Sequence, residues 1–317
     1  MVEDNQIKAQ VSPFAIREGE IKTFDGKDGY VSMNQIVHKI NIGHITDIHF
    51  AILELVNQFE FITSRQLYQM LEIKGIDAKS QDKLNNKLEA LVKSKILTRY
   101  YFTSEEGKGI YRIYCLEKMG KYLLNSKEIE CKWQPSDNTK PVPMIKKRLA
   151  GNQTLIAYLR KVKAFDDFVV KPSLTAKTAG KVFKATGGSV KLTKNKKSIQ
   201  FLFEVIRREP DWKKKLVEKM RLYQDFYANF VPGDSGFSTM PQLIFVCEDE
   251  KHMAETFKEI ITNQVEIPQL KLYFTTDLRQ NEETLENTLV EFKLVDGKYK
   301  MENIFWESVT ILFLQYL

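Results

Sequence analysis

One acid in an apolar run is the first residue of chemical interest. Residues 199–206, IQFLFEVI, place large apolar side chains on both faces of a predicted strand and include a single acid, Glu204. A carboxylate at the centre of a sheet is costly unless it pairs with a base or holds a cation. Glu204 is therefore a candidate for the metal-holding acid of a nuclease, or for one half of an internal salt bridge.

Basic residues follow Glu204 directly. Arg207 and Arg208 end the predicted strand, and Lys213 and Lys214 lie at the start of a helix predicted from about residue 211. A helix start binds phosphate well, because its first backbone N–H groups are unpaired and the helix dipole is positive there. We therefore predict that these four side chains contact DNA phosphate.

The net charge of +7 is unevenly distributed along the chain. Residues 146–197 hold fourteen Lys or Arg against two acids, so this segment carries +12 and the rest carries −5. Charge concentrated in this way indicates a surface that faces a polyanion. Its densest part is the basic turn of Lys194, Lys196 and Lys197. An ordinary solvated, lysine-rich surface is the alternative.

Other catalytic and metal-binding patterns are missing from the sequence. His44 and His49 are five residues apart rather than the four of a helical zinc pair. The three cysteines follow no CxxC spacing, which fits a reducing cytosol. Neither a GxxxxGK[ST] phosphate loop nor a GxSxG nucleophile motif occurs. We predict no metal site and no cofactor, with Mg²⁺ needed only if the chain is a nuclease.

A winged helix-turn-helix is predicted over residues 43–126, after an N-terminal arm of residues 1–42. Apolar residues recur at helical spacing through the first part of this domain. Thr63 and Gln66 then form a capping-box pattern at the start of a second helix, and a third helix starts near Ser80. A β-rich pair of segments around a glycine-containing turn follows, which predicts the hairpin, or wing.

The third helix is the predicted DNA-reading element, because the second helix of a helix-turn-helix motif lies in the major groove. With its leucines inward, the residues on its exposed side and flanks are Lys79, Lys83, Asn85 and Asn86. Lysine suits phosphate or guanine, and asparagine suits adenine. Basic residues of the wing that suit contacts with the DNA backbone are Arg99, Lys108 and Arg112.

Two alternatives to DNA contact stay open for this domain. Arg99 and Arg112 can pair with acids of the hairpin itself. The domain can also bind protein instead of DNA, and Asp82 and Glu89 favour this because acids repel phosphate.

A second domain is predicted over residues 144–317, after a polar linker of residues 127–143 that contains three prolines. It opens with a basic helix, and the strand–helix–strand–helix–strand order over 199–276 predicts parallel strands with crossover helices. Asp296-Gly297 predicts a C-terminal hairpin. The predicted fold class is therefore α/β, with an α+β winged helix-turn-helix followed by an α/β domain.

The most apolar segment is the tail of residues 304–317. It has 14 residues and includes Glu307, whereas a helix needs about 20 residues to cross a bilayer. We therefore predict a core helix or strand here and no membrane partner.

The element order resembles the replication-relaxation family of plasmid and conjugative-element proteins. The resemblance covers roughly residues 45–276 and includes the segments FITSRQLYQML, LVKSKILTRYYF and QLIFVCEDE. It implies that the second domain is similar to the restriction-endonuclease-like PD-(D/E)xK nuclease fold.

An active nuclease of that kind would need an Asp on one strand and Glu-x-Lys on the next, to hold a divalent cation and position water. Glu204 matches the Glu, but Ile206 stands in place of the Lys, and the preceding segment KATGGSVKL contains no Asp. We expect Glu204 to be a vestigial acid that pairs with a nearby base. A rearranged site that uses Lys213 with Asp166 or Asp167 is the alternative.

These features predict a cytoplasmic DNA-binding accessory protein of a plasmid or conjugative element, with a role in replication or mobilisation. The expected partner is double-stranded DNA, and a relaxase or replication protein is a further candidate. A homodimer is one open oligomeric state. The alternative functions are a Mg²⁺-dependent DNA endonuclease and a winged-helix adaptor between proteins.

Overall fold

The computed structural model describes residues 12–104, 107–162, 165–194, 197–281 and 288–304, without the side chains of 107–110, 165–166, 194 and 197. The chain divides into two compact units. We call Ile16–Pro172 with Thr186–Val190 the winged-helix unit. We call Met1–Ala15, Ser173–Ala185 and Lys191–Leu317 the sheet unit.

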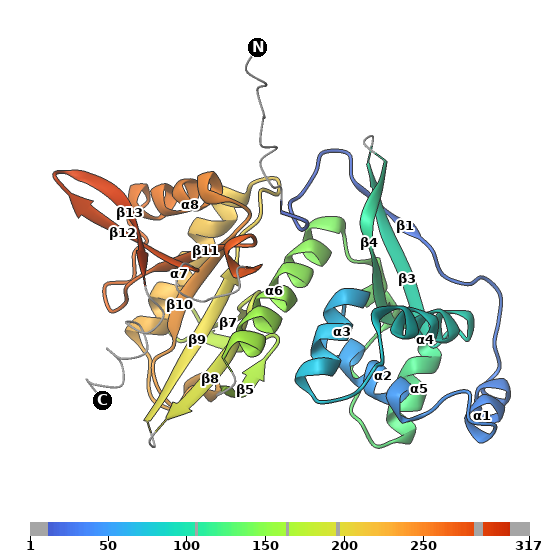
Figure 1. The fold of residues 1–317 in the computed structure, drawn as a ribbon. Helices are drawn as coiled ribbons and strands as arrows, with labels where there is room; N and C mark the ends of the chain where they lie inside the picture. The colour runs from blue at the N-terminus through green and yellow to red at the C-terminus, as the bar shows by residue number, and fades with distance from the viewer. Residues whose placement is uncertain (1–11, 105–106, 163–164, 195–196, 282–287, 305–317) are drawn as a thin grey trace, which may run out of the picture. The chain divides into compact units, whose positions relative to one another are not determined.

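The winged-helix unit contains the predicted helices and hairpin. Its central elements are α2 (Asp47–Phe59), β2 (Ile62–Thr63), α3 (Ser64–Ile73), α4 (Gln81–Lys93), β3 (Leu97–Ser104), β4 (Gly107–Leu116) and α5 (Lys118–Ser126). Strand β4 lies between β3 and β2 in an antiparallel sheet. Three helices with this sheet and hairpin form a winged helix (Figure 1).

The helix starts follow the capping pattern of the sequence. At the start of α3, the Thr63 side chain accepts from the Gln66 N–H, and Gln66 Oε1 accepts from the Thr63 N–H, so the predicted capping box is confirmed. The Ser80 side chain caps α4 by accepting from the Lys83 N–H. These bonds satisfy donors that a helix start leaves unpaired.

The predicted N-terminal arm contributes ordered elements to this unit. Strand β1 (Ile21–Phe24) pairs antiparallel with β3, and α1 (Met33–Asn41) starts at a capping box between Ser32 and Gln35. The sequence analysis predicted only an arm here and did not predict α1.

The boundary between the units differs from the predicted linker at 127–143. A 3-10 turn, η1 (Pro135–Thr139), precedes α6 (Val142–Lys161), and both this helix and β5 (Phe165–Val169) belong to the winged-helix unit. Twelve of the twenty α6 residues are buried. Asn152 of α6 donates to Phe59 O and Phe61 O, and Gln66 donates to Leu149 O. The predicted basic helix is therefore part of the core of the first unit.

A mixed sheet has the strand order β13-β12-β11-β10-β9-β8-β5. Its parallel centre consists of β9 (Lys197–Val205), β10 (Gln242–Cys247) and β11 (Tyr273–Thr276). Helices α7 (Trp212–Ala228) and α8 (Glu250–Thr262) connect these strands in turn. The predicted crossover arrangement and the α/β class are confirmed.

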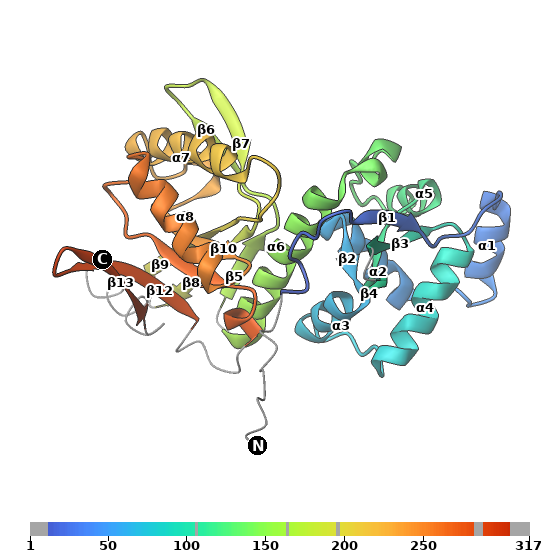
Figure 2. The same cartoon turned by 90° about the horizontal axis from the view of Figure 1, so that it is seen from above.

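The remaining strands flank the parallel centre of this sheet or form the separate β6–β7 pair. They are β6 (Ser173–Ala176), β7 (Lys181–Lys184), β8 (Gly188–Lys194), β12 (Leu289–Val295) and β13 (Lys298–Ile304), with the 3-10 turns η2 (Asp234–Gly236) and η3 (Arg279–Asn281). The predicted turn at Asp296-Gly297 joins β12 to β13, and both residues have positive φ. Hairpin β6–β7 lies beside α7 (Figure 2), where Asp225 accepts from the N–H groups of Thr178 and Ala179.

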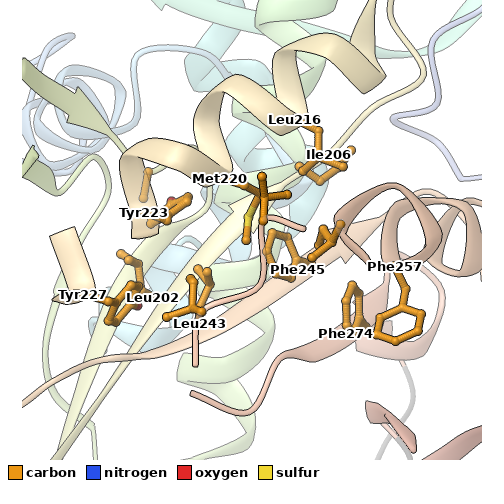
Figure 3. Close-up of a cluster of buried hydrophobic side chains, with 14 of the residues drawn as sticks. Leu202, Ile206, Leu216, Met220, Tyr223, Tyr227, Leu243, Phe245, Phe257 and Phe274 are labelled. Carbon is orange, nitrogen blue, oxygen red and sulfur yellow. The ribbon is translucent and has the colours of Figure 1, made fainter. Parts of the chain in front are cut away.

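The core of the sheet unit lies where α7 and α8 cover one face of the parallel strands. Figure 3 shows Leu202, Leu243 and Phe245 from the strands packed against Met220 and Tyr223 of α7. Side chains on the opposite faces of β9 and β10 are also buried. Both faces being covered explains why these strands read as continuous apolar runs.

No helix in the described ranges combines the length and the apolar composition that are needed to cross a membrane. The predicted core element at residues 304–317 lies outside the described residues, apart from Ile304 at the end of β13.

Candidate nucleic-acid interface

Helix α4 presents the predicted DNA-reading face to solvent. Leu84, Leu88, Leu91 and Val92 are buried, which turns the opposite side of the helix outward. The predicted contact residues Lys79, Lys83, Asn85 and Asn86 are all exposed. The sequence therefore placed this face correctly, because helical periodicity alone determines which side is apolar.

The ions on and beside this face are weakly engaged. The Lys79 ammonium lies 2.6 Å from Asp77, but both side chains are about two-thirds or more exposed, at 76% and 65%. An exposed pair of this kind contributes little and exchanges easily for another anion. Lys83 has no acid partner among the residues that the structure describes. The side-chain oxygen of Asn85 accepts a hydrogen bond from the Gln81 amide. The amide N–H groups of Asn85 take no part in this bond.

The wing arginines are held by acids of the protein itself. Arg99 lies 2.6 Å from Glu89 of α4 and 2.9 Å from Asp25, and Arg112 lies 2.8 Å from the same Asp25 oxygen. Partial burial disfavours the charge on Asp25, but its bonds to Arg112 and Arg99 outweigh burial and lower its pKa. The alternative that these arginines pair internally is therefore confirmed, although the acids come from α4 and from the segment after β1 rather than from the hairpin.

Of the two wing arginines, only Arg112 keeps a largely exposed side chain, at 59% against 14% for Arg99. Arg112 is thus the more accessible of the two wing arginines, although it also pairs with Asp25. The side chain of Lys108 lies outside the described residues.

Glu204 forms an internal salt bridge with Lys219. Its carboxylate is 2% exposed and accepts from Lys219 Nζ at 2.7 Å and from the Tyr223 hydroxyl at 2.8 Å, both on α7. Burial, together with the charge of Glu204, raises the pKa of Tyr223 well above its ordinary value, so this hydroxyl stays protonated and donates. Within the described ranges, no group of three or more His, Cys, Asp or Glu side chains could hold a metal ion.

Arg207 does not lie on the surface, so the prediction that it contacts DNA is wrong. Its side chain is fully buried and donates from Nη2 to both oxygens of Asp277, at 2.7 and 2.9 Å, and from Nη1 to Ile206 O. The acid lies 70 residues further along the chain. No local sequence pattern predicts a partner at this distance along the chain.

The predicted phosphate site at the start of α7 is filled by acids of the sheet unit. Arg208 pairs with Asp249 and Glu248, and Lys213 lies 2.7 Å from Glu259. DNA phosphate would have to displace these carboxylates. Lys214 is exposed and has no acid partner in the described ranges, but a single lysine does not make a phosphate site.

Part of the basic segment 146–197 is also directed inward. Lys146 is buried and pairs with Glu20, and Lys171 pairs with Glu60. The side chains of Lys194, Lys196 and Lys197 lie outside the described residues. The +12 of this segment therefore overstates the charge that the surface presents.

Neither a protein-family model nor a curated protein matches this sequence. The similarity to the replication-relaxation family thus stays a prediction that rests on element order and short segments.

Proposed function

We propose that the chain is a DNA-binding accessory protein of a plasmid or conjugative element, in which the winged helix contacts duplex DNA and the sheet unit is not catalytic. The observation that carries the proposal is the exposed face of α4 with Lys79, Lys83, Asn85 and Asn86. The mobile-element setting, and a relaxase or replication protein as partner, rest on the family resemblance.

The residue types on this face suit two kinds of DNA contact, one with phosphate and one with base edges. Lys79 and Lys83 flank the start of α4, where the phosphate backbone would also meet the unpaired N–H groups of the helix. Asn85 and Asn86 follow two and three residues after Lys83, and asparagine can form a bidentate pair with adenine in the major groove. Arg112 of the wing would add a backbone contact.

Binding to a labelled duplex, measured by fluorescence anisotropy over a salt series, tests the proposal. Affinity should fall steeply with salt, because each neutralised phosphate releases counterions. Lys83→Ala should weaken binding to all sequences and reduce the magnitude of the log–log salt slope by about 1. Lys132→Ala is the control, because Lys132 is an exposed lysine of the same unit that does not belong to α4.

Two outcomes would contradict the proposal that the α4 face binds DNA. One is an affinity that does not change with salt. The other is an equal loss of affinity in Lys83→Ala and Lys132→Ala, which would indicate general attraction rather than a defined face.

A protein–protein adaptor is the second candidate, and the neutralised wing favours it. Asp25 and Glu89 cancel much of the positive charge of Arg99 and Arg112, which a DNA-binding wing would normally keep available. A pull-down that survives nuclease treatment, combined with no gel shift at low salt, would support this function over the first.

The nuclease alternative is tested with supercoiled plasmid and Mg²⁺ or Mn²⁺. We expect no cleavage, since Glu204 is engaged by Lys219 and Tyr223. Cleavage by the wild-type chain that is lost in Glu204→Gln would establish the nuclease instead.

A further inference from the structure

Strand β13 forms one edge of the mixed sheet. It is the first strand in the order β13-β12-β11-β10-β9-β8-β5, and β12 is its one hydrogen-bonded neighbour among the described strands. Figure 1 shows the β12–β13 hairpin extending from the sheet. An edge strand presents N–H and C=O groups that can pair with another chain.

One face of this hairpin is apolar; its Phe292 and Tyr299 contact Phe257 of α8, and three of its side chains stay about half exposed. Leu294, Tyr299 and Met301 are 62%, 49% and 45% exposed. Leu294 lies opposite Tyr299 and Phe292 opposite Met301 in the strand register, so these side chains share a face. A contiguous apolar surface at a sheet edge is typical of an interaction site.

The other face carries an unusual charge pattern. Lys293 lies directly opposite Lys300, and Glu291 directly opposite Glu302. Like charges in these positions are unfavourable. The diagonal pair of Lys293 and Glu302, at 2.7 Å, relieves part of this repulsion. Lys300 is left without an acid partner among the described residues.

We propose that β13 pairs antiparallel with β13 of a second copy of this chain, about a two-fold axis through Met301. Met301 is the midpoint of Lys298–Ile304, so this register pairs every described residue of the strand. It also places Lys300 of each copy opposite Glu302 of the other, which gives Lys300 the acid that its own hairpin does not supply. A two-fold interface joins the same patch on both copies, so both favourable pairs form at once.

Neighbouring registers are worse on electrostatic grounds. An axis at Tyr299 would place Lys298 opposite Lys300. An axis at Lys300 or at Glu302 would place that charge opposite itself. Of the registers compared, the one through Met301 is therefore the one with complementary charge, and its apolar face becomes continuous across the axis through the two Met301 side chains.

The test uses exchanged charges in the full chain. Wild-type protein should show a monomer–dimer equilibrium by sedimentation equilibrium over about a 50-fold range of micromolar concentrations. Lys300→Glu and Glu302→Lys should each be monomeric, because each places two like-charge pairs across the axis. An equimolar mixture of the two variants should form a heterodimer, because both cross-strand pairs are then opposite in sign.

A matched control separates the pairing from general charge effects. Lys298→Glu changes the same charge on the same strand, but its partner across the axis is Ile304, so dimerisation should persist. Thermal unfolding by circular dichroism verifies that each variant is folded. A wild-type chain that stays monomeric, single variants that dimerise like wild type, or a mixture of folded variants that stays monomeric would each overturn the proposal.

Discussion

His252 is a neutral base held inside the sheet unit. Its ring is fully buried against the edge of Trp212, and its Nδ1 accepts from the Glu248 N–H. Burial lowers its pKa from 6.5 to about 3, and the charges of Arg208 and Arg207 act in the same direction. The folded chain therefore excludes a proton that the unfolded chain readily binds.

This exclusion sets a pH dependence. Between pH 6.5 and about 3 the unfolded chain carries a proton on this imidazole and the folded chain does not. The contribution of His252 to stability is complete above pH 6.5 and is lost as the pH falls through this window, by at most about 1.4 kcal/mol per pH unit.

We predict that His252→Asn makes the free energy of unfolding less sensitive to pH. The asparagine oxygen can replace Nδ1 as the acceptor for the Glu248 N–H and does not titrate. Urea unfolding at pH 7 and pH 5 should show a wild-type decrease that exceeds the variant's by on the order of 1–2 kcal/mol. Burial also lowers the pKa of His49, but His49 is present in both proteins and cancels. Equal decreases would contradict the prediction.

The partners of Glu204 and Arg207 show which side-chain contacts the sequence can predict. Lys219 and Tyr223 lie four residues apart on the same side of α7, and both contact Glu204. That α7 covers Glu204 of β9 is a result of tertiary packing, which spacing does not contain. The same limit explains Arg207, whose partner Asp277 is distant in sequence.

At the scale of elements, α6 is the segment whose assignment the sequence misjudged. Three prolines indicated a linker, but Pro135 begins a 3-10 turn and Pro143 lies in the first turn of α6. A proline in a first turn costs nothing, because its missing N–H would have no partner there. The sequence predicted a basic helix near this position, but composition alone could not show that it belongs to the winged-helix unit.

Asn152 of α6 supports an uncommon turn at the end of α2. Glu60 has φ 66° and ψ −63°, and the Phe61 N–H donates across it to Phe59 O. This is a γ-turn with positive φ, a strained conformation that needs outside support. Asn152 Nδ2 donates to the carbonyls on both sides of Glu60. Helix α6 thus stabilises the turn that ends α2.

We predict that Gly151→Ala disrupts this packing. A Cβ at residue 151 would lie 2.5 Å from Thr186 O and 3.0 Å from Gly187 Cα, both backbone atoms. Overpacking of this kind costs about 1–3 kcal/mol, and unyielding backbone favours the upper end. Thermal or urea unfolding measures the loss.

Gln153→Ala is the control on the same helix, because its side chain is only partly buried. A Gly151→Ala protein as stable as this control would show that the loop at Thr186 moves aside freely.

At the scale of the whole molecule, charge is divided between the surface and the interior. Lys146 and Arg207 are buried with acid partners, while Lys79 and Lys83 are exposed beside α4. The net charge of +7 therefore does not indicate where a polyanion would bind. What sequence periodicity predicted correctly is which side of α4 is exposed to solvent.

We predict that equal losses of charge have unequal effects on DNA affinity. Lys79→Ala with Lys83→Ala should reduce the magnitude of the salt slope by about 0.9 for each lost phosphate contact. Lys181→Ala with Lys184→Ala removes two exposed lysines of β7 and should leave the slope near its wild-type value. Anisotropy titrations at several salt concentrations measure both. Equal reductions would show that affinity follows total charge rather than the α4 face.

The division of the chain has a consequence for how the protein is made. The chain passes between the two units four times, after residues 15, 172, 185 and 190. The winged-helix unit can close once Val190 has left the ribosome. The sheet unit cannot, because Ser12 donates to Asp277, 265 residues later. At about 5–20 residues per second, synthesis of the chain between Ser12 and Asp277 takes roughly 15–50 s. The winged-helix unit can therefore fold before the sheet unit is complete.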